Sequence, residues 1–289
     1  MLKRFVRRHP VKTQRFLEIL PGFTSWSLIL FPLWGSFLIP EIVAYYIIAF
    51  DVYWLYRSLT MAILAIIAHF KIRASVVYDW FRDVKKLEHW KKMKHIIIIP
   101  TYKEPLTTLE RTLNTLTNQT FPLKQLFITL SFEEREGEDA KHKAKILLKQ
   151  FGDTFGNLWV TYHPDIHGEV KGKSSNTSWG AKVAKQKLIA EQNADIDYVT
   201  ITSEDADALF HPHYFSALTY EFLTNPKRYN RIWQPSIMFY NNIWKVAPPI
   251  RVLASIFSVN QMFILMRSDR LVNFSTYSLS LKLVDAIGY

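Results

Sequence analysis

Two long apolar stretches near the N-terminus constrain this chain more than any other feature. Ile19 to Pro40 contains no formally charged residue. Its segment Phe23–Ile39 would rise about 26 Å as one helix, close to the thickness of a bilayer's hydrocarbon core. A second apolar stretch runs from Ile42 to Phe70 and is interrupted by Asp51 and Arg57. Because the linker between the stretches is short, the sequence predicts a transmembrane helical hairpin.

Other interpretations of these stretches fit less well. A cleaved signal peptide is disfavoured because the first stretch is long, is rich in Trp and Phe, and precedes no small-x-small cleavage site. A pair of buried soluble helices is disfavoured by the length and aromatic content of both stretches. Asp51 and Arg57 would each cost about 2.5–3.5 kcal/mol at mid-bilayer. Either each faces a protein partner, which is the commoner case, or the helix tilts so that one reaches an interface; a transport role is disfavoured.

Charge gives the hairpin an orientation. The chain has 36 Lys and Arg against 25 Asp and Glu, a net charge of +11. Basic residues flank the hairpin on both sides, in residues 1–20 and 71–94, while the linker carries none. The positive-inside rule then predicts both ends in the cytoplasm, in a multi-pass protein of the inner or plasma membrane. We expect these flanks to contact acidic membrane lipids and no nucleic acid.

Composition excludes several classes of protein. The chain is 49% hydrophobic and 21% charged, which is too apolar for a disordered chain. It contains no cysteine, so disulfides, thiolate metal sites and a cysteine nucleophile are all excluded.

Beyond residue 94 the sequence alternates between apolar runs and amphipathic segments. Such alternation predicts an α/β domain with a mainly parallel sheet. In such sheets ligands bind at the carboxyl ends of the strands. The predicted strands are 95–99, 126–130, 158–162 and 198–202, and the predicted helices are 106–116, 137–151, 175–190 and one beginning near Pro212.

Three polar motifs follow predicted strands or precede a predicted helix. Asp205-Ala206-Asp207 comes directly after the fourth strand, and two such carboxylates can hold a hard cation against a diphosphate. An acidic loop before the next helix is the structural alternative. Tyr102 and Glu104 follow the first strand, where a ring can stack on a base and a carboxylate can accept hydrogen bonds. The Gly-containing segment 169–176 enters a helix with two lysines, which suits a phosphate site.

Together these motifs resemble the membrane-integrated family 2 glycosyltransferases, the group that includes the cellulose and hyaluronan synthases. Four elements match in order: Pro100-Thr101-Tyr102-x-Glu104, the spacing from Lys171 to Asn176, Asp205-Ala206-Asp207, and Trp233-Gln234-Pro235. The resemblance covers about residues 95–260. It implies a GT-A fold and inverting, metal-dependent transfer, with Mg²⁺ or Mn²⁺, from a UDP- or GDP-sugar to a glycan or lipid acceptor.

The resemblance also implies roles for individual residues. Donor binding falls to six positions, one of them a glutamate after the second strand, and metal ligation to one. Tyr102 and Glu104 would contact the nucleoside, Lys171 the phosphates with Asn176 supporting that loop, Asp205 the donor and Asp207 the metal ion.

Two departures from the family pattern stand out. Family members carry an Asp after the second strand to read the base. Here Glu133 or Glu134 would substitute, and Glu133 is taken as the donor-binding residue. The family's catalytic base lies in a T/E-D motif before a Q-x-x-R-W. The later acids here, Glu221, Asp269 and Asp285, are not in that setting. We therefore expect a C-terminally truncated and inactive chain, with its base beyond the last residue.

Two further clusters are interpreted as structural. His211-Pro212-His213 could ligate Zn²⁺ or Mn²⁺, but a helix start is the favoured interpretation. Asp165 and His167 are expected to be loop residues.

The predicted organisation is a basic cytosolic N-terminus (1–20), a transmembrane hairpin (21–70), a basic juxtamembrane segment (71–94) and a GT-A domain incomplete at its C-terminus (95–289). Two non-enzymatic alternatives remain. One is a noncatalytic, membrane-tethered nucleotide-binding module or pseudoenzyme. The other is a lipid-surface anchor whose α/β domain scaffolds other proteins.

Overall fold

The computed structural model describes residues 9–267, 269 and 276–289. The chain divides into two compact units, one up to Ile63 and one from Leu64 onward. The boundary falls inside a long helix.

Two helices make up the described part of the first unit. Helix α2 (Pro10–Leu38) starts well before the predicted apolar stretch, and Pro10 at its first turn suits a helix start. Helix α3 (Pro40–Val77) follows after one residue. The two pack closely at the turn: a Cβ at Gly35 would lie 2.8 Å from the Val43 side chain. Farther from the turn, the Tyr46 hydroxyl donates to the Leu28 carbonyl at 3.1 Å.

Both helices expose apolar side chains along their length. Phe37 is 89% exposed, Trp26 is 64% exposed and Leu55 is 63% exposed. By length and composition α2 and α3 are each able to cross a membrane, which confirms the prediction of two long apolar helices. A third helix, α9 (Pro248–Leu265), is also long and apolar enough by the same criterion.

The second unit is built on a six-stranded sheet in the order β3-β2-β1-β4-β6-β5. Neighbours among the first four strands pair in parallel, while β6 pairs antiparallel with both β4 and β5. The prediction of an α/β domain with a mainly parallel sheet is therefore confirmed. The strands are β1 (Lys94–Thr101), β2 (Leu126–Glu133), β3 (Asn157–His163), β4 (Val199–Ser203), β5 (Ile232–Trp233) and β6 (Tyr277–Ser280).

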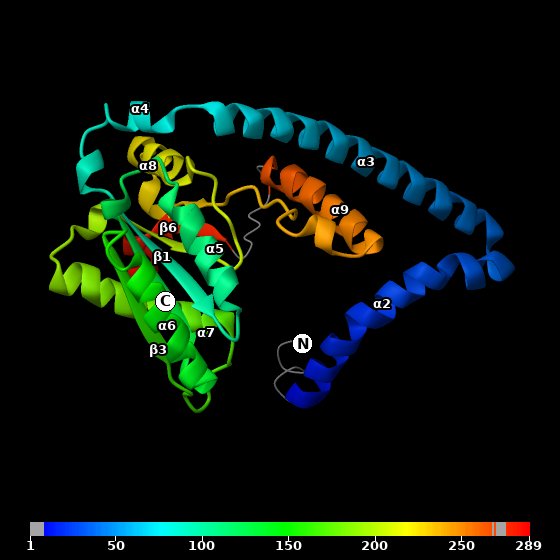
Figure 1. Ribbon diagram of the computed structural model, residues 1–289. Coiled ribbons are helices and arrows are strands. Elements are labelled where there is room, and N and C mark those ends of the chain that lie inside the picture. Colours follow the sequence, from blue (N-terminus) through cyan, green and yellow to red (C-terminus); the bar gives the residue numbers. More distant parts are fainter. Residues whose placement is uncertain (1–8, 268, 270–275) are drawn as a thin grey trace. The chain divides into compact units, whose positions relative to one another are not determined.

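Helices cover both faces of this sheet (Figure 1). In β1, Ile97 and Ile99 point to one apolar core, while Ile96 and Ile98 point to the other. The four central residues of β1, Ile96 to Ile99, are all apolar because both faces of the strand are buried. The first core holds α5 (Leu106–Thr117), α6 (Glu138–Phe151) and α8 (Tyr214–Thr224), and the second holds α7 (Lys173–Lys185) and α10 (Leu281–Ile287).

Several boundaries differ from the predicted ones. The helix predicted over 175–190 begins at Lys173 and passes into a π-helical segment, Gln186–Glu191. The helix expected near Pro212 begins at Tyr214, after His213 at its N-cap. A short helix, α4 (Trp80–Val84), packs against α8 through Trp80 and Tyr220, whose ring centroids are 5.5 Å apart.

Candidate functional site

The parallel strands bring the polar motifs to one edge of the sheet. Thr101 pairs with Phe132, Glu133 pairs with His163, and Ile98 pairs with Ser203, so β1, β2, β3 and β4 end close together. This is the edge at which α/β proteins bind ligands. The carboxyl ends of β1, β2 and β4, which the polar motifs follow, therefore lie at one edge of the sheet.

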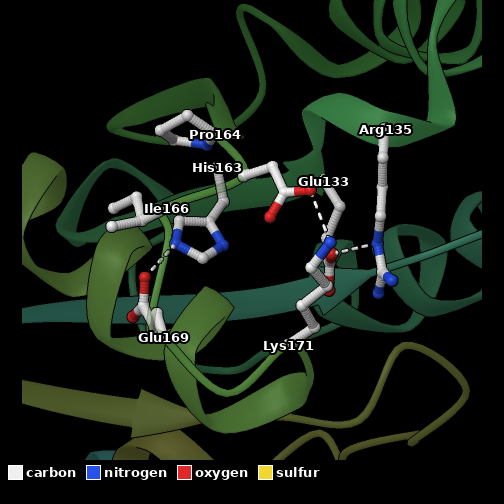
Figure 2. A pocket seen from close by; sticks show the side chains of 8 residues that line it. Glu133, Arg135, His163, Pro164, Ile166, Glu169 and Lys171 are labelled. Atoms are coloured by element: carbon white, nitrogen blue, oxygen red, sulfur yellow. Dashed lines mark hydrogen bonds and ion pairs between the residues drawn. The ribbon is translucent and has the colours of Figure 1, made fainter.

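A small pocket lies at the ends of β2 and β3 (Figure 2). The Glu133 carboxylate is almost fully buried and pairs with Arg135 Nε at 2.5 Å. His163 Nε2 lies 3.2 Å from a Glu169 carboxylate oxygen across the pocket. The lining residues are Glu133, Arg135, His163, Pro164, Asp165, Ile166, Glu169 and Lys171.

The sequence leaves two candidates, Glu133 and Glu134, for the carboxylate that reads the nucleobase. Glu133 is the one that lines this pocket. Glu134 is exposed and starts a 3₁₀ turn. Asp165 lies in a loop, as expected, and also lines the pocket. His167 is an exposed loop residue.

The loop after β1 is fastened to the loop after β2. The Arg135 guanidinium lies over the Tyr102 ring, 4.1 Å from its centroid. The backbone N–H of Lys103, a residue at φ +59°, donates to a Glu136 carboxylate oxygen at 2.9 Å. The other Glu136 oxygen accepts from Lys143 Nζ at 2.8 Å. This buried carboxylate thus holds the exposed Tyr102 in place.

The basic segment before α7 divides its two lysines between different acids. Lys171 pairs with Asp165 in the pocket, whereas Lys173 pairs with Asp205. Lys173 is the first residue of α7, after Gly172 at φ +154°. The lysine next to the acidic motif is therefore Lys173 rather than Lys171, and only the fold reveals which of the two reaches it.

Asn176 fixes the start of α7 to β2. It is 1% exposed, and its Nδ2 donates to the Ser131 carbonyl at 2.7 Å while the Ser131 hydroxyl donates to its Oδ1 at 2.7 Å. The helix lies very close to the sheet here, since a Cβ at Gly180 would be 2.9 Å from the Ser131 hydroxyl. Asn176 therefore supports this loop through contacts with β2.

The two aspartates after β4 differ in surroundings. Asp205 is partly exposed and is paired with Lys173, while Asp207 is exposed. The described residues contain no group of three or more His, Asp or Glu side chains arranged to hold a metal ion. The chemistry of Asp207 suits a hard cation such as Mg²⁺ or Mn²⁺, provided that a bound diphosphate supplies further oxygen ligands. Glu104 is partly buried just before α5.

A buried carboxyl group that sequence reasoning missed precedes these aspartates. Glu204 is fully buried, and neither of its side-chain oxygens has a hydrogen-bond partner in the described part of the chain. Burial, and then the negative charge of Asp205, raise the pKa of Glu204 well above its usual range. The signal available in the sequence was its position beside a fully buried strand, which placed it at the edge of the core.

His211 and His213 are placed as structural residues. Their ring centroids lie 5.3 Å apart. His213 Nδ1 lies 3.2 Å from the Thr120 hydroxyl, and the His213 backbone N–H donates to His211 Nδ1 at 3.3 Å. These contacts connect the start of α8 to the loop after α5.

No family model matches the chain, and no curated protein matches it. Among solved structures, a mannosyltransferase from Pyrobaculum calidifontis, in complex with GDP-Man and Mn²⁺, matches with 12% sequence identity and a TM-score of 0.44. The match covers 79% of this chain and 58% of that one, so this chain spans less than two thirds of that structure.

Proposed function

We propose that this chain is a membrane-anchored glycosyltransferase of the GT-A type, which binds a nucleotide-diphosphate sugar together with Mg²⁺ or Mn²⁺. The observation that carries the proposal is the convergence of three kinds of group at one sheet edge. Tyr102 supplies an aromatic face, Lys173 supplies a cation at the start of a helix, and Asp205 and Asp207 supply carboxylates. The aromatic face suits a nucleobase, the cation at the helix start suits a diphosphate, and the carboxylates suit the metal ion that accompanies the diphosphate.

Each residue has a specific task in this proposal. Tyr102, held by Glu136 and Arg135, presents a ring on which a nucleobase stacks, and Glu133 accepts hydrogen bonds from the base. Lys173 and the first N–H groups of α7 attract the phosphates. When Lys173 leaves its ion pair with Asp205 to contact the phosphates, Asp205 becomes free to contact the donor.

The divalent ion would be held by Asp207. When bound, such an ion neutralises charge on the departing diphosphate. Inverting transfer of the sugar to a glycan or lipid acceptor completes the proposal.

The two apolar helices support the membrane part of the proposal. Spans over α2 and α3, with residues 21–70 as the hairpin, would place the domain from residue 95 onward at the cytoplasmic face of the inner or plasma membrane. The basic segments 1–20 and 71–94 on either side of the hairpin favour that orientation.

A binding experiment tests the donor site. The full chain in lipid nanodiscs is titrated with UDP and with GDP by calorimetry, with and without Mn²⁺. We expect Mn²⁺ to strengthen binding of one nucleotide, and Asp207→Asn to abolish that dependence, because an amide carries no charge to attract the ion. Asp153→Asn, an exposed aspartate in the turn after α6, is the matched control. Retained Mn²⁺ dependence in the Asp207 variant contradicts the assignment.

A second measurement separates the enzyme from a noncatalytic nucleotide-binding module. Membranes containing the chain are supplied with a panel of UDP- and GDP-sugars and acceptors, and release of nucleotide diphosphate is followed. Acceptor-dependent release supports transfer. Tight, Mn²⁺-dependent binding without release across the panel favours the module.

A further inference from the structure

Helix α9 (Pro248–Leu265) presents an apolar face that its own domain leaves uncovered. The exposed side chains recur at spacings of three and four, so they form one broad stripe along the first half of the helix. They are Ile250, Val252, Leu253, Ile256 and Phe257, each between 52% and 58% exposed. Exposed apolar stripes of this kind mark interaction surfaces.

The sheet topology excludes a single membrane crossing by α9, although its length and composition would allow one. Strand β5 precedes α9 and strand β6 follows it, and these two strands pair with each other. Gln234 Nε2 also donates to the Thr276 carbonyl at 2.7 Å, so the two ends of the segment between β5 and β6 are joined by a hydrogen bond as well. Both ends of the segment therefore return to the same side of any bilayer, whereas one spanning helix would separate them.

The opposite face of α9 is polar and faces the protein. The Ser258 hydroxyl, which lies on that face, accepts from the Phe239 backbone N–H at 3.0 Å, and Ser258 is 6% exposed. A helix that is apolar on one side and polar on the other lies in a membrane surface more readily than it spans one.

Aromatic and basic residues gather at the start of α9. Trp244 is 81% exposed, and the Arg251 guanidinium lies 5.4 Å from its ring centroid. Lys245 is exposed beside it. Trp favours the headgroup region of a bilayer, and Lys and Arg are attracted by acidic lipids.

We propose that α9 lies in the plane of the membrane surface, with its apolar stripe in the acyl boundary and its basic end among acidic lipid headgroups. Helices α2 and α3 are long and apolar enough to anchor the chain in a membrane, so lipid is available to cover the stripe of α9. Asn241 Nδ2, in the segment that leads to α9, donates to the Asp207 carbonyl at 3.1 Å. The edge that holds the aspartates is thereby connected to the bilayer surface.

Depth-dependent fluorescence quenching tests this placement. The chain contains no cysteine, so single cysteines can be labelled with bimane without background. Leu253→Cys and Phe257→Cys report on the stripe, and Ser255→Cys, an exposed residue on the other side of the same helix, is the control. The full chain is placed in nanodiscs of phosphatidylcholine and phosphatidylglycerol, without nucleotide. The nanodiscs carry a doxyl quencher either near the headgroup or near the end of the acyl chain.

We expect the headgroup-proximal quencher to act most strongly at positions 253 and 257, with a several-fold smaller quenching constant at 255. Such a pattern corresponds to a depth of about 5–10 Å below the headgroups. Replacing phosphatidylglycerol by phosphatidylcholine should reduce quenching at both stripe positions. Val252→Cys repeats the measurement at a third stripe position.

Four results would overturn the proposal. Strongest quenching of 257 by the deep quencher would mean that α9 spans. Strongest quenching of 253 and 257 by aqueous iodide would place the stripe in water. Protection from all quenchers would mean that protein covers it, either other helices of this chain or a second copy. Insensitivity to lipid charge would remove the role of acidic lipid. None of these results depends on nucleotide binding, so the donor-site proposal stands or falls separately.

Discussion

The guanidinium carbon of Arg135 lies 4.1 Å from the centre of the Tyr102 ring, although the two residues belong to loops after different strands. Arg135 Nε also pairs with Glu133 at 2.5 Å. One side chain therefore touches both an aromatic face and a carboxylate at the edge where the proposed nucleotide binds. Arg135 was not singled out in the sequence, because nothing there shows which residue lies opposite Tyr102.

Arg135→Ala should weaken nucleotide binding. The variant removes the cation–π contact with Tyr102 and leaves the Glu133 charge without its partner next to an incoming anionic nucleotide. We expect a loss of about 1–2 kcal/mol, or about 5- to 30-fold in affinity for the nucleotide, measured by calorimetry. Arg111→Ala, on the exposed side of α5, is the matched control. Unchanged binding by the Arg135 variant would show that this side chain does not order the ring for the nucleotide, and tighter binding would show that it blocks the ring.

Glu136→Gln should lower thermal stability. Glu136 accepts from the Lys103 backbone N–H and from the nearly buried Lys143, and a neutral amide leaves that ammonium with Asp139 alone. We expect a cost of about 1–3 kcal/mol, seen as a lower unfolding temperature in detergent. Glu138→Gln removes an exposed glutamate two residues away and should change stability by less than about 0.5 kcal/mol. Equal effects of the two substitutions would contradict the buried role of Glu136.

His95 should make the protein sensitive to acid. Its two ring nitrogens lie 2.6 Å and 2.8 Å from the hydroxyls of Thr200 and Thr219, and burial lowers its pKa to about 3. A pKa below the unfolded value means that stability is full above about pH 6.5 and is lost as the pH falls towards the folded value. Unfolding temperature measured from pH 7 to pH 4 should therefore fall, and His95→Gln should flatten the slope. His142→Gln, on the exposed side of α6, should keep the slope of the unmodified chain.

Glu204 should have the opposite pH dependence. Its pKa is raised, so its contribution to stability is full below the unfolded pKa, near 4.5, and is lost as the pH rises towards the folded value. Glu204→Gln keeps the shape but carries no ionisable proton. We expect this variant to have a higher unfolding temperature than the unmodified chain at pH 8, and a flatter profile above pH 5. If the exposed Glu134→Gln flattens the profile equally, Glu204 is not the source.

Periodicity alone was sufficient to predict the centre of the fold. The run from His95 to Ile99 indicates a strand buried on both faces, and Leu109, Leu113 and Leu116 indicate the buried face of the next helix. The strand ends then place Tyr102 and Asp205 on one edge, because parallel strands end together.

Other parts could not be predicted from local pattern. Strand β5 has two residues, and β6 reads Tyr-Ser-Leu-Ser, which is too short and too polar to indicate a buried strand. Both exist because they pair with each other, and because β6 also pairs with β4. The sequence of helix α9 shows that it is apolar, but the proposal that it lies in the membrane surface depends on the strands on either side of it. Likewise the choice between Lys171 and Lys173 depends on the entry geometry of α7.

The insertion of β6 between β4 and β5 has a consequence for how the chain is made. The ribosome delivers the strands in numerical order, so β1 to β4 can pair while β6 has not yet been synthesised. During that interval β4 is an open sheet edge, and such edges invite pairing with other chains. The late strand Tyr277–Ser280 closes it. Losing that strand should therefore lead to aggregation of nascent chains.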